Sequence, residues 1–154
     1  MRPVRRGRIA TVGLDSPFLS ARVAGADARF LGLLASAVDR IPPGIPPIRT
    51  LERVSLRRRG DLPGLVGLTT WAERPRGRVL AGGRQTLTFY SELLDRVSDA
   101  ASLAVVAHEL AHAWLNEHAE PEDSVARERE ADELARRWGF GRELDALEAE
   151  TEPA

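Results

Sequence analysis

The feature that most constrains this chain is an uninterrupted apolar segment, residues 102–118, which contains two histidines four positions apart. Its apolar residues recur at helical spacing, with neither glycine nor proline between them: Leu103, Val106, Ala107, Leu110, Ala111 and Trp114. The pattern predicts a helix. On such a helix His108 and His112 lie about 40° apart around the axis, so both can bind one metal ion.

The same segment carries a glutamate next to the first histidine, in the order His108-Glu109-Leu110-Ala111-His112, which fits the pattern H-E-x-x-H. Glu109 is offset by about 100° from His108, which places its carboxylate beside a metal ion, where it can hold a metal-bound water. Two solvated histidines on an amphipathic helix would give the same pattern. The apolar surroundings favour the metal site, because buried histidines need polar partners.

A catalytic zinc ion needs a third protein ligand and keeps one position for water. The first candidate is Glu128. It lies in a second predicted helix, residues 127–140, with Ser124 as its N-cap and Gly139 as its stop. Asp132, one turn further on, shares the face of Glu128 and can accept the free ring N–H of a zinc-bound histidine.

Other arrangements remain open for the third ligand at this point. Glu130 lies about 200° from Glu128, on the far side of the helix, and a helix laced with charges can simply face solvent. His118 follows His112 at the spacing of the third histidine in metzincins, H-E-x-x-H-x-x-G-x-x-H. Leu115 stands where metzincins have a turning glycine, and leucine resists a left-handed turn. Otherwise His118 ends the helix near its carbonyl dipoles.

Taken together, the two motifs resemble those of the gluzincins, zinc peptidases in which H-E-x-x-H is followed by E-x-x-x-D. The second motif here is Glu128-Arg-Glu-Ala-Asp132, and the resemblance covers roughly residues 84–140. This stretch is also similar to ImmA/IrrE-type peptidases, and the short chain is similar to minigluzincins. The resemblance implies that His108, His112 and Glu128 bind one zinc ion and that Asp132 supports a ligand.

The resemblance also implies a zincin-like α+β fold and a zinc-dependent endopeptidase of narrow specificity. In this mechanism Glu109 takes a proton from the zinc-bound water as that water attacks the scissile carbonyl, then passes the proton to the leaving amine. Tyr90, His118 and the nearby arginines are all candidates for stabilising the oxyanion. The alternative is a zinc-stabilised interaction or regulatory domain without catalysis. Glu109 argues against it, because a purely structural site does not need that residue.

Residues 85–90 predict a strand shortly before the predicted metal-binding helix. In gluzincins an edge strand at this place in the sequence pairs with the extended substrate. The resemblance therefore implies that this strand lines the cleft and adds a bound peptide to its edge. The residues expected to do so are Thr86, Leu87, Thr88 and Phe89. An ordinary sheet strand would carry the same sequence.

The remaining segments predict a small α+β fold with a mixed or antiparallel sheet of three or four strands. Short strands are expected at residues 8–15, 50–59, 65–72, 78–80 and 85–90. Residues 27–40 predict an amphipathic helix, and residues 142–150 predict another. The sheet is expected to pack on the first of these, on the metal-binding helix and on the ligand helix. Four prolines make residues 41–47 a stiff linker.

A length of 154 residues suits one domain, residues 1–154, with a possible N-terminal extension at 1–25 and a flexible tail at 150–154. A net charge of −1 gives no reason to expect nucleic acid, and without cysteine there is no disulfide. No segment predicts a membrane span or a signal peptide, so the expected compartment is cytoplasmic. The expected partner is a peptide or protein substrate; the oligomeric state is not indicated.

Two charged segments add further hypotheses. Arg57-Arg58-Arg59 is either a solvated strand end or a site for an acidic partner. The acidic C-terminal residues 141–154 could fold across the cleft of the site and block it, as a prosegment does.

Overall fold

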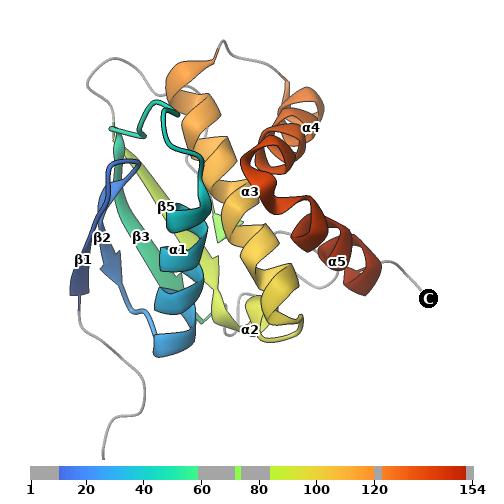
Figure 1. Ribbon diagram of the computed structural model, residues 1–154. Helices are drawn as coiled ribbons and strands as arrows, with labels where there is room; N and C mark the ends of the chain where they lie inside the picture. The colour runs from blue at the N-terminus through green and yellow to red at the C-terminus, as the bar shows by residue number, and fades with distance from the viewer. Residues whose placement is uncertain (1–10, 59–71, 74–83, 120–122, 152–154) are drawn as a thin grey trace, which may run out of the picture.

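The computed structural model describes residues 11–58, 72–73, 84–119 and 123–151. Within these ranges the chain has an α+β fold with a mixed sheet and several helices (Figure 1). The elements, in chain order, are β1 (Thr11–Asp15), β2 (Ser20–Ala24), α1 (Ala28–Arg40), β3 (Leu51–Arg57), β4 (Ala72–Glu73), β5 (Gln85–Tyr90), α2 (Ser91–Leu94), α3 (Asp99–His118), α4 (Ser124–Ala135), a π-helical turn η1 (Arg136–Phe140) and α5 (Gly141–Thr151).

The sheet has five strands in the order β1-β2-β3-β5-β4. β1 and β2 form an antiparallel hairpin, β2, β3 and β5 run parallel, and β4 pairs antiparallel with β5. Parallel neighbours need a crossover connection, and α1 supplies the one between β2 and β3. The predicted α+β class with a mixed sheet is confirmed.

β5 lies inside the sheet rather than at its edge. It pairs with β3 along its length, and on the other side its residues Thr88 and Phe89 are register partners of Glu73 and Ala72 in β4. The prediction that residues 85–90 form an edge strand is therefore wrong at Thr88 and Phe89, where an added peptide would have to displace β4. The prediction failed because strand order depends on a segment that pairs from elsewhere in the chain.

The hairpin of β1 and β2 lies within residues 1–25, which were expected to form an N-terminal extension of the domain. The sequence pattern does not predict β2, although its side chains alternate: Ala21 and Val23 are buried, whereas Ser20 and Arg22 are exposed. Alanine is a weak strand former, and the alternation covers only a few residues. The pattern therefore gives little indication of a strand. Since β2 pairs with β3, the described part of the expected extension belongs to the sheet.

The core forms where the sheet meets α1 and α3. In β5, Leu87 and Phe89 are buried and alternate with Thr86 and Thr88, which are more exposed. The ring of Phe89 packs against Phe30 of α1, with ring centroids 5.3 Å apart. Complete burial of such a side chain stabilises a fold by about 1.5–3 kcal/mol. This packing fixes α1 on the sheet.

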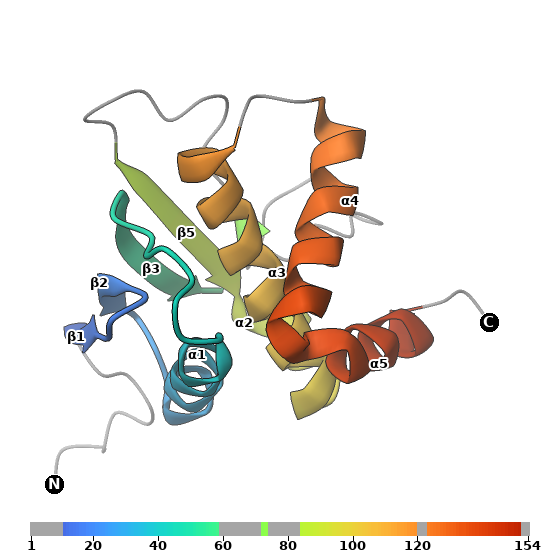
Figure 2. The same cartoon turned by 45° about the horizontal axis from the view of Figure 1, so that its top comes forward.

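α3 is covered on two sides. α1 packs beside it over the sheet, and α4 and α5 pack against its other side (Figures 1 and 2). A helix buried in this way is apolar almost all round, which explains the continuous apolar run that predicts it. The hydroxyl of Ser98 caps the helix by accepting a hydrogen bond from the backbone N–H of Ala101 at 3.1 Å. The predicted helix is confirmed and begins earlier, at Asp99.

α4 and α5 meet at a bend, where Gly139 has a φ of 103°, a left-handed conformation that favours glycine. The predicted stop at Gly139 thus marks a real change of direction. The sequence suggests Ser124 as the N-cap of α4, but the N-cap in the structure is Asp123. The Asp123 carboxylate accepts a hydrogen bond from the backbone N–H of Ala126 at 2.9 Å. Serine and aspartate are comparable caps, so composition alone cannot distinguish the two positions.

Other predicted elements fall partly outside the described residues. Of the strands expected at 65–72 and 78–80, only Ala72, the first residue of β4, is described. The helix expected at 27–40 is α1, capped by Asp27, whose side chain accepts from the Phe30 backbone N–H at 2.8 Å. In the described ranges no helix combines the length and the apolar character needed to cross a bilayer.

Candidate metal site

Three possible ligand atoms from α3 and α4 converge on one point. His108 and His112 lie one turn apart on α3, and Glu128 lies in the first half of α4. The two Glu128 oxygens are 2.9 Å from His108 Nε2 and 3.1 Å from His112 Nε2, and the two Nε2 atoms are 3.1 Å apart. The three residues form a group that could hold a metal ion.

The spacing of these atoms fits a tetrahedral ion. Donor atoms about 2.1 Å from such an ion lie about 3.4 Å from one another. The separations of 2.9 and 3.1 Å are slightly shorter, so a small outward movement of the Glu128 carboxylate would admit a cation. The fit supports a metal site without defining which metal it binds.

Asp132 determines where the proton of His108 lies. Its Oδ1 is 2.8 Å from His108 Nδ1, so in the neutral ring Nδ1–H donates to the carboxylate and Nε2 carries a lone pair. That lone pair faces the carboxylate of Glu128, which is also an acceptor. Two acceptors at this distance repel each other unless a proton or another cation lies between them.

The charges around His108 favour a cation at this point. Burial lowers the pKa of His108, but hydrogen bonds to Asp132 and Glu128 and the negative charges of Glu109 and Glu128 outweigh burial and raise the pKa to about 9. The hydrogen bond with His108 also lowers the pKa of Asp132. A metal ion would supply, in place of the proton, the positive charge that these carboxylates stabilise.

Glu109 lies beside the cluster without belonging to it. Its side chain is buried, at 3% exposure, and its charge contributes to the raised pKa of His108. The group of three ligand residues does not include it. A buried carboxylate next to the ligands is where the H-E-x-x-H pattern predicts the residue that transfers protons. That catalytic role stays a prediction.

The cluster is open to solvent on the α4 side. The side chains of Glu128 and Asp132 are 47% and 49% exposed, whereas those of His108 and His112 are 16% and 3% exposed. The histidines therefore form the floor of the site, and the two carboxylates of α4 form one of its walls. The cluster is therefore accessible on the side where these two carboxylates lie.

His118 lies away from this cluster. It ends α3, about 15 Å along the helix axis from His108. Its Nε2 is 2.9 Å from the carbonyl oxygen of Pro47 and 2.8 Å from a carboxylate oxygen of Glu117, and its ring packs on Trp114. The structure therefore brings Glu128, and not His118, to the two histidines. α3 continues as a helix where metzincins turn.

The other candidate residues also lie outside the cluster. A carboxylate oxygen of Glu130 is 3.3 Å from Arg127 Nη1 on α4, so Glu130 does not join the ligands. Tyr90 is half-buried at the end of β5, where its register partner is Arg57. The suggested stabilisation of an oxyanion by Tyr90 stays a prediction. His118 does not fit this role, because it lies about 15 Å along α3 from His108 and its Nε2 contacts Pro47 and Glu117.

A buried polar network that was not predicted from the sequence fixes α3 against the sheet near the site. Gln85 is fully buried, and its amide group donates to Thr50 Oγ1 at 2.8 Å and to the carbonyl of Ala113 at 2.9 Å. Its Oε1 accepts from the Asn116 side chain at 3.2 Å. Ala113 directly follows His112. The signal was a glutamine at an inward-facing position of an alternating strand.

The C-terminal helix does not cover the cluster. Near the end of α5, the carboxylate of Glu150 accepts hydrogen bonds from the backbone N–H and the hydroxyl of Ser98, at 2.7 and 2.6 Å. Ser98 caps the start of α3, about 15 Å along the axis from His108. The predicted C-terminal segment across the cleft is therefore wrong as far as Thr151, the last described residue.

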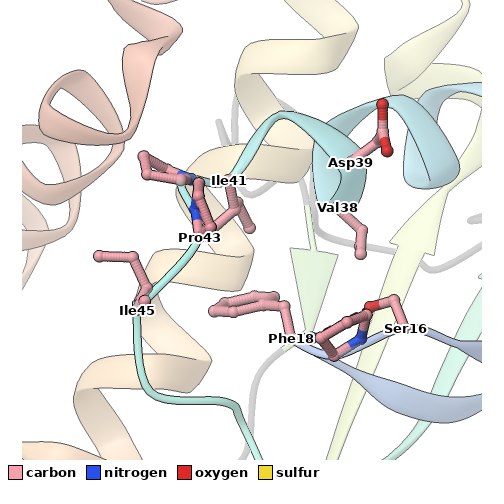
Figure 3. A pocket seen from close by; sticks show the side chains of 10 residues that line it. Ser16, Phe18, Val38, Asp39, Ile41, Pro43 and Ile45 are labelled. Carbon is pink, nitrogen blue, oxygen red and sulfur yellow. Dashed lines mark hydrogen bonds between the residues drawn. The ribbon is translucent and has the colours of Figure 1, made fainter.

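A separate hollow of about 280 Å³ lies between the β1–β2 hairpin and the linker that follows α1 (Figure 3). Apolar side chains such as Phe18, Val38 and Ile45 line most of it. Among the described residues around this hollow only Asp39 is charged. It therefore offers no set of metal ligands comparable with the cluster between α3 and α4.

No protein-family model, no curated protein and no solved structure matches the chain. The geometry and chemistry of the described residues are therefore what indicates a function.

Proposed function

We propose that this chain is a zinc-dependent endopeptidase of the gluzincin type. The observation that carries the proposal is the convergence of His108, His112 and Glu128, with the buried carboxylate of Glu109 beside them. Two imidazoles and one carboxylate are the protein ligands of zinc in thermolysin-type hydrolases. A set of three leaves the fourth position of a tetrahedral ion open, as a catalytic site requires.

Zinc in this site would act as a Lewis acid that activates water near neutral pH and polarises a peptide carbonyl. The chain's own residues would do the rest. Asp132 accepts the Nδ1 proton of His108 and keeps Nε2 directed at the ligand position. Glu109 accepts the proton of the attacking water and donates it to the leaving amine. Tyr90 remains a candidate for stabilising the oxyanion, whereas the position of His118 at the end of α3 excludes that residue.

The proposed substrate is a peptide or protein segment, cut with narrow specificity. The alternative is a zinc-stabilised interaction or regulatory domain without catalysis. Structural zinc sites are usually closed by four protein ligands, whereas the cluster within the described residues contains three. The half-exposed carboxylates of Glu128 and Asp132 leave it accessible. Both features favour the enzyme.

Two measurements test the proposal. The first is zinc per chain in the purified protein, in Glu128→Ala and in the control Glu130→Ala, which removes a carboxylate outside the cluster. We expect close to one zinc in the wild type and the control, and a large loss in Glu128→Ala. The second is cleavage of a mixed peptide library by the zinc-loaded protein. A wild type that binds no zinc, or zinc retained in Glu128→Ala, would refute the proposed site.

A further inference from the structure

Val125 is the one large apolar side chain that is exposed among the described residues, at 70%. It lies in the first turn of α4, where Asp123 serves as N-cap. The cap hydrogen bond goes to Ala126, so capping makes no use of Val125. A β-branched residue does not favour helix formation either. Single exposed apolar residues are common, and it is the location of this one that matters.

Val125 lies on the part of the α4 surface that carries Glu128 and Asp132. It precedes Glu128 by three positions, so the two side chains are neighbours on the surface of α4. It precedes Asp132 by seven positions, which places the two within about 20° of each other around the helix. The cluster opens to solvent on this side, because Glu128 and Asp132 are half-exposed. Val125 therefore forms an apolar part of a polar rim.

We propose that Val125 contacts an apolar side chain of the bound peptide, within two residues of the bond that is cut. The inference rests on the proposed function. The helical rise from Val125 to Glu128 is about 4.5 Å, and neighbouring residues of an extended peptide are about 3.5 Å apart. A side chain that touches Val125 thus belongs to a residue next to the metal. Valine presents only methyl groups, so burial of apolar surface is the contribution it can make.

The experiment uses hydroxamates, small bidentate metal ligands, with the zinc-loaded protein. Acetohydroxamate contacts the metal alone. Two further hydroxamates carry an isobutyl group on the first or the second carbon after the metal-binding group. Dissociation constants are measured for the wild type, Val125→Ser, Val125→Ile and the control Glu133→Ser, which changes an exposed residue elsewhere on α4. Zinc content is measured for each variant.

We expect at least one isobutyl hydroxamate to bind the wild type more tightly than acetohydroxamate. Val125→Ser should weaken that compound about five- to tenfold and leave acetohydroxamate unchanged. Val125→Ile and Glu133→Ser should retain both affinities. If Val125→Ser changes the dissociation constants of all three hydroxamates equally, or if the wild type does not prefer an isobutyl compound, the inference about Val125 is wrong. The proposed function would not be affected by either result. A wild type without zinc-dependent hydroxamate binding would refute the proposed function, and the inference with it.

Discussion

Nδ1 of His108 lies 2.8 Å from Oδ1 of Asp132, and this contact orients the Nε2 atom that faces Glu128. Asp132→Asn keeps the shape of the side chain but removes its charge and one acceptor. We expect zinc affinity to fall about 10- to 100-fold, the usual effect of losing the carboxylate behind a ligating histidine. Competition with a chelator measures it. Glu130→Gln, also on α4, is the control and should bind zinc normally.

Glu109→Gln separates catalysis from metal binding. Since Glu109 lies outside the ligand group, the variant should retain zinc at the wild-type level. Peptide cleavage should fall at least 100-fold, because an amide cannot accept the proton of the attacking water. Zinc content and the rate of cleavage of a peptide substrate are measured together. Retained activity would contradict the assignment of Glu109 as general base, and loss of zinc would make it a ligand instead.

Metal removal should destabilise the fold. The ligands come from two helices, and an ion that binds them only in the folded state adds about 2.7 kcal/mol at a free concentration 100-fold above its dissociation constant. For a chain of this size we expect the melting temperature to be roughly 5–10 °C higher with zinc than without it. Thermal unfolding with zinc and with a chelator measures the difference. Glu128→Ala should show almost no difference in melting temperature between zinc and chelator. A difference as large as that of the wild type would mean that the ion binds elsewhere.

The ion pair between Arg40 and Glu143 should make stability depend on pH in the acid range. The hydrogen bond from Arg40, at 2.6 Å, holds the pKa of Glu143 below its ordinary value of 4.5. A lowered pKa in the folded state means that the contribution is present above pH 4.5 and is lost as the pH falls through the folded-state pKa. Glu143→Gln should therefore lower the free energy of unfolding by about 1 kcal/mol at pH 7 and by less near pH 3.

Denaturant unfolding at both pH values checks this prediction. Glu148→Gln, an exposed position on the same helix, is the control and should change little at either pH. A constant difference between the wild type and Glu143→Gln across the acid range would show that the ionisation of Glu143 contributes nothing.

Gln85→Met should be among the more damaging substitutions in the chain. The new side chain has a similar size but cannot satisfy the carbonyl of Ala113 or the hydroxyl of Thr50. A buried group left without its partner costs about 1–3 kcal/mol, and we expect about 2 kcal/mol by urea unfolding. Thr86→Val, at the neighbouring exposed position of β5, should change the stability by less than about 0.5 kcal/mol. Similar effects of the two variants would contradict a structural role for the network.

Local patterns were sufficient to predict the helices of the candidate site. α3 follows from an apolar run without breakers, and the i,i+4 spacing places Glu128 and Asp132 on one face of α4. Both residues contact His108 in the structure. The meeting of the two helices is not a local property, however. Spacing alone left His118 open as a ligand, and only the uninterrupted course of α3 to His118 removes it.

The sheet was harder to predict because its order is not local. β5 has the alternation of a strand, but nothing in residues 85–90 indicates whether another strand lies outside it. In the structure β4 lies outside β5, although β4 contributes only Ala72 and Glu73 to the described sheet. β2 was missed because its inward side chains, Ala21 and Val23, are small. Gln85 was overlooked because a polar residue inside a strand is significant only when its buried partners are known.

The His108 contacts to Glu128 and Asp132 span only 20 and 24 positions. The site is thus made by one helical hairpin, while β2 and β3 must be joined across the whole of α1. Contacts between residues close in sequence form faster than long-range ones. We therefore expect the α3–α4 hairpin to capture zinc while the sheet is still assembling, so that the metal acts as an early organiser of folding. Stopped-flow refolding should then be faster with zinc than with a chelator, and equal rates would show that the ion binds only the completed fold.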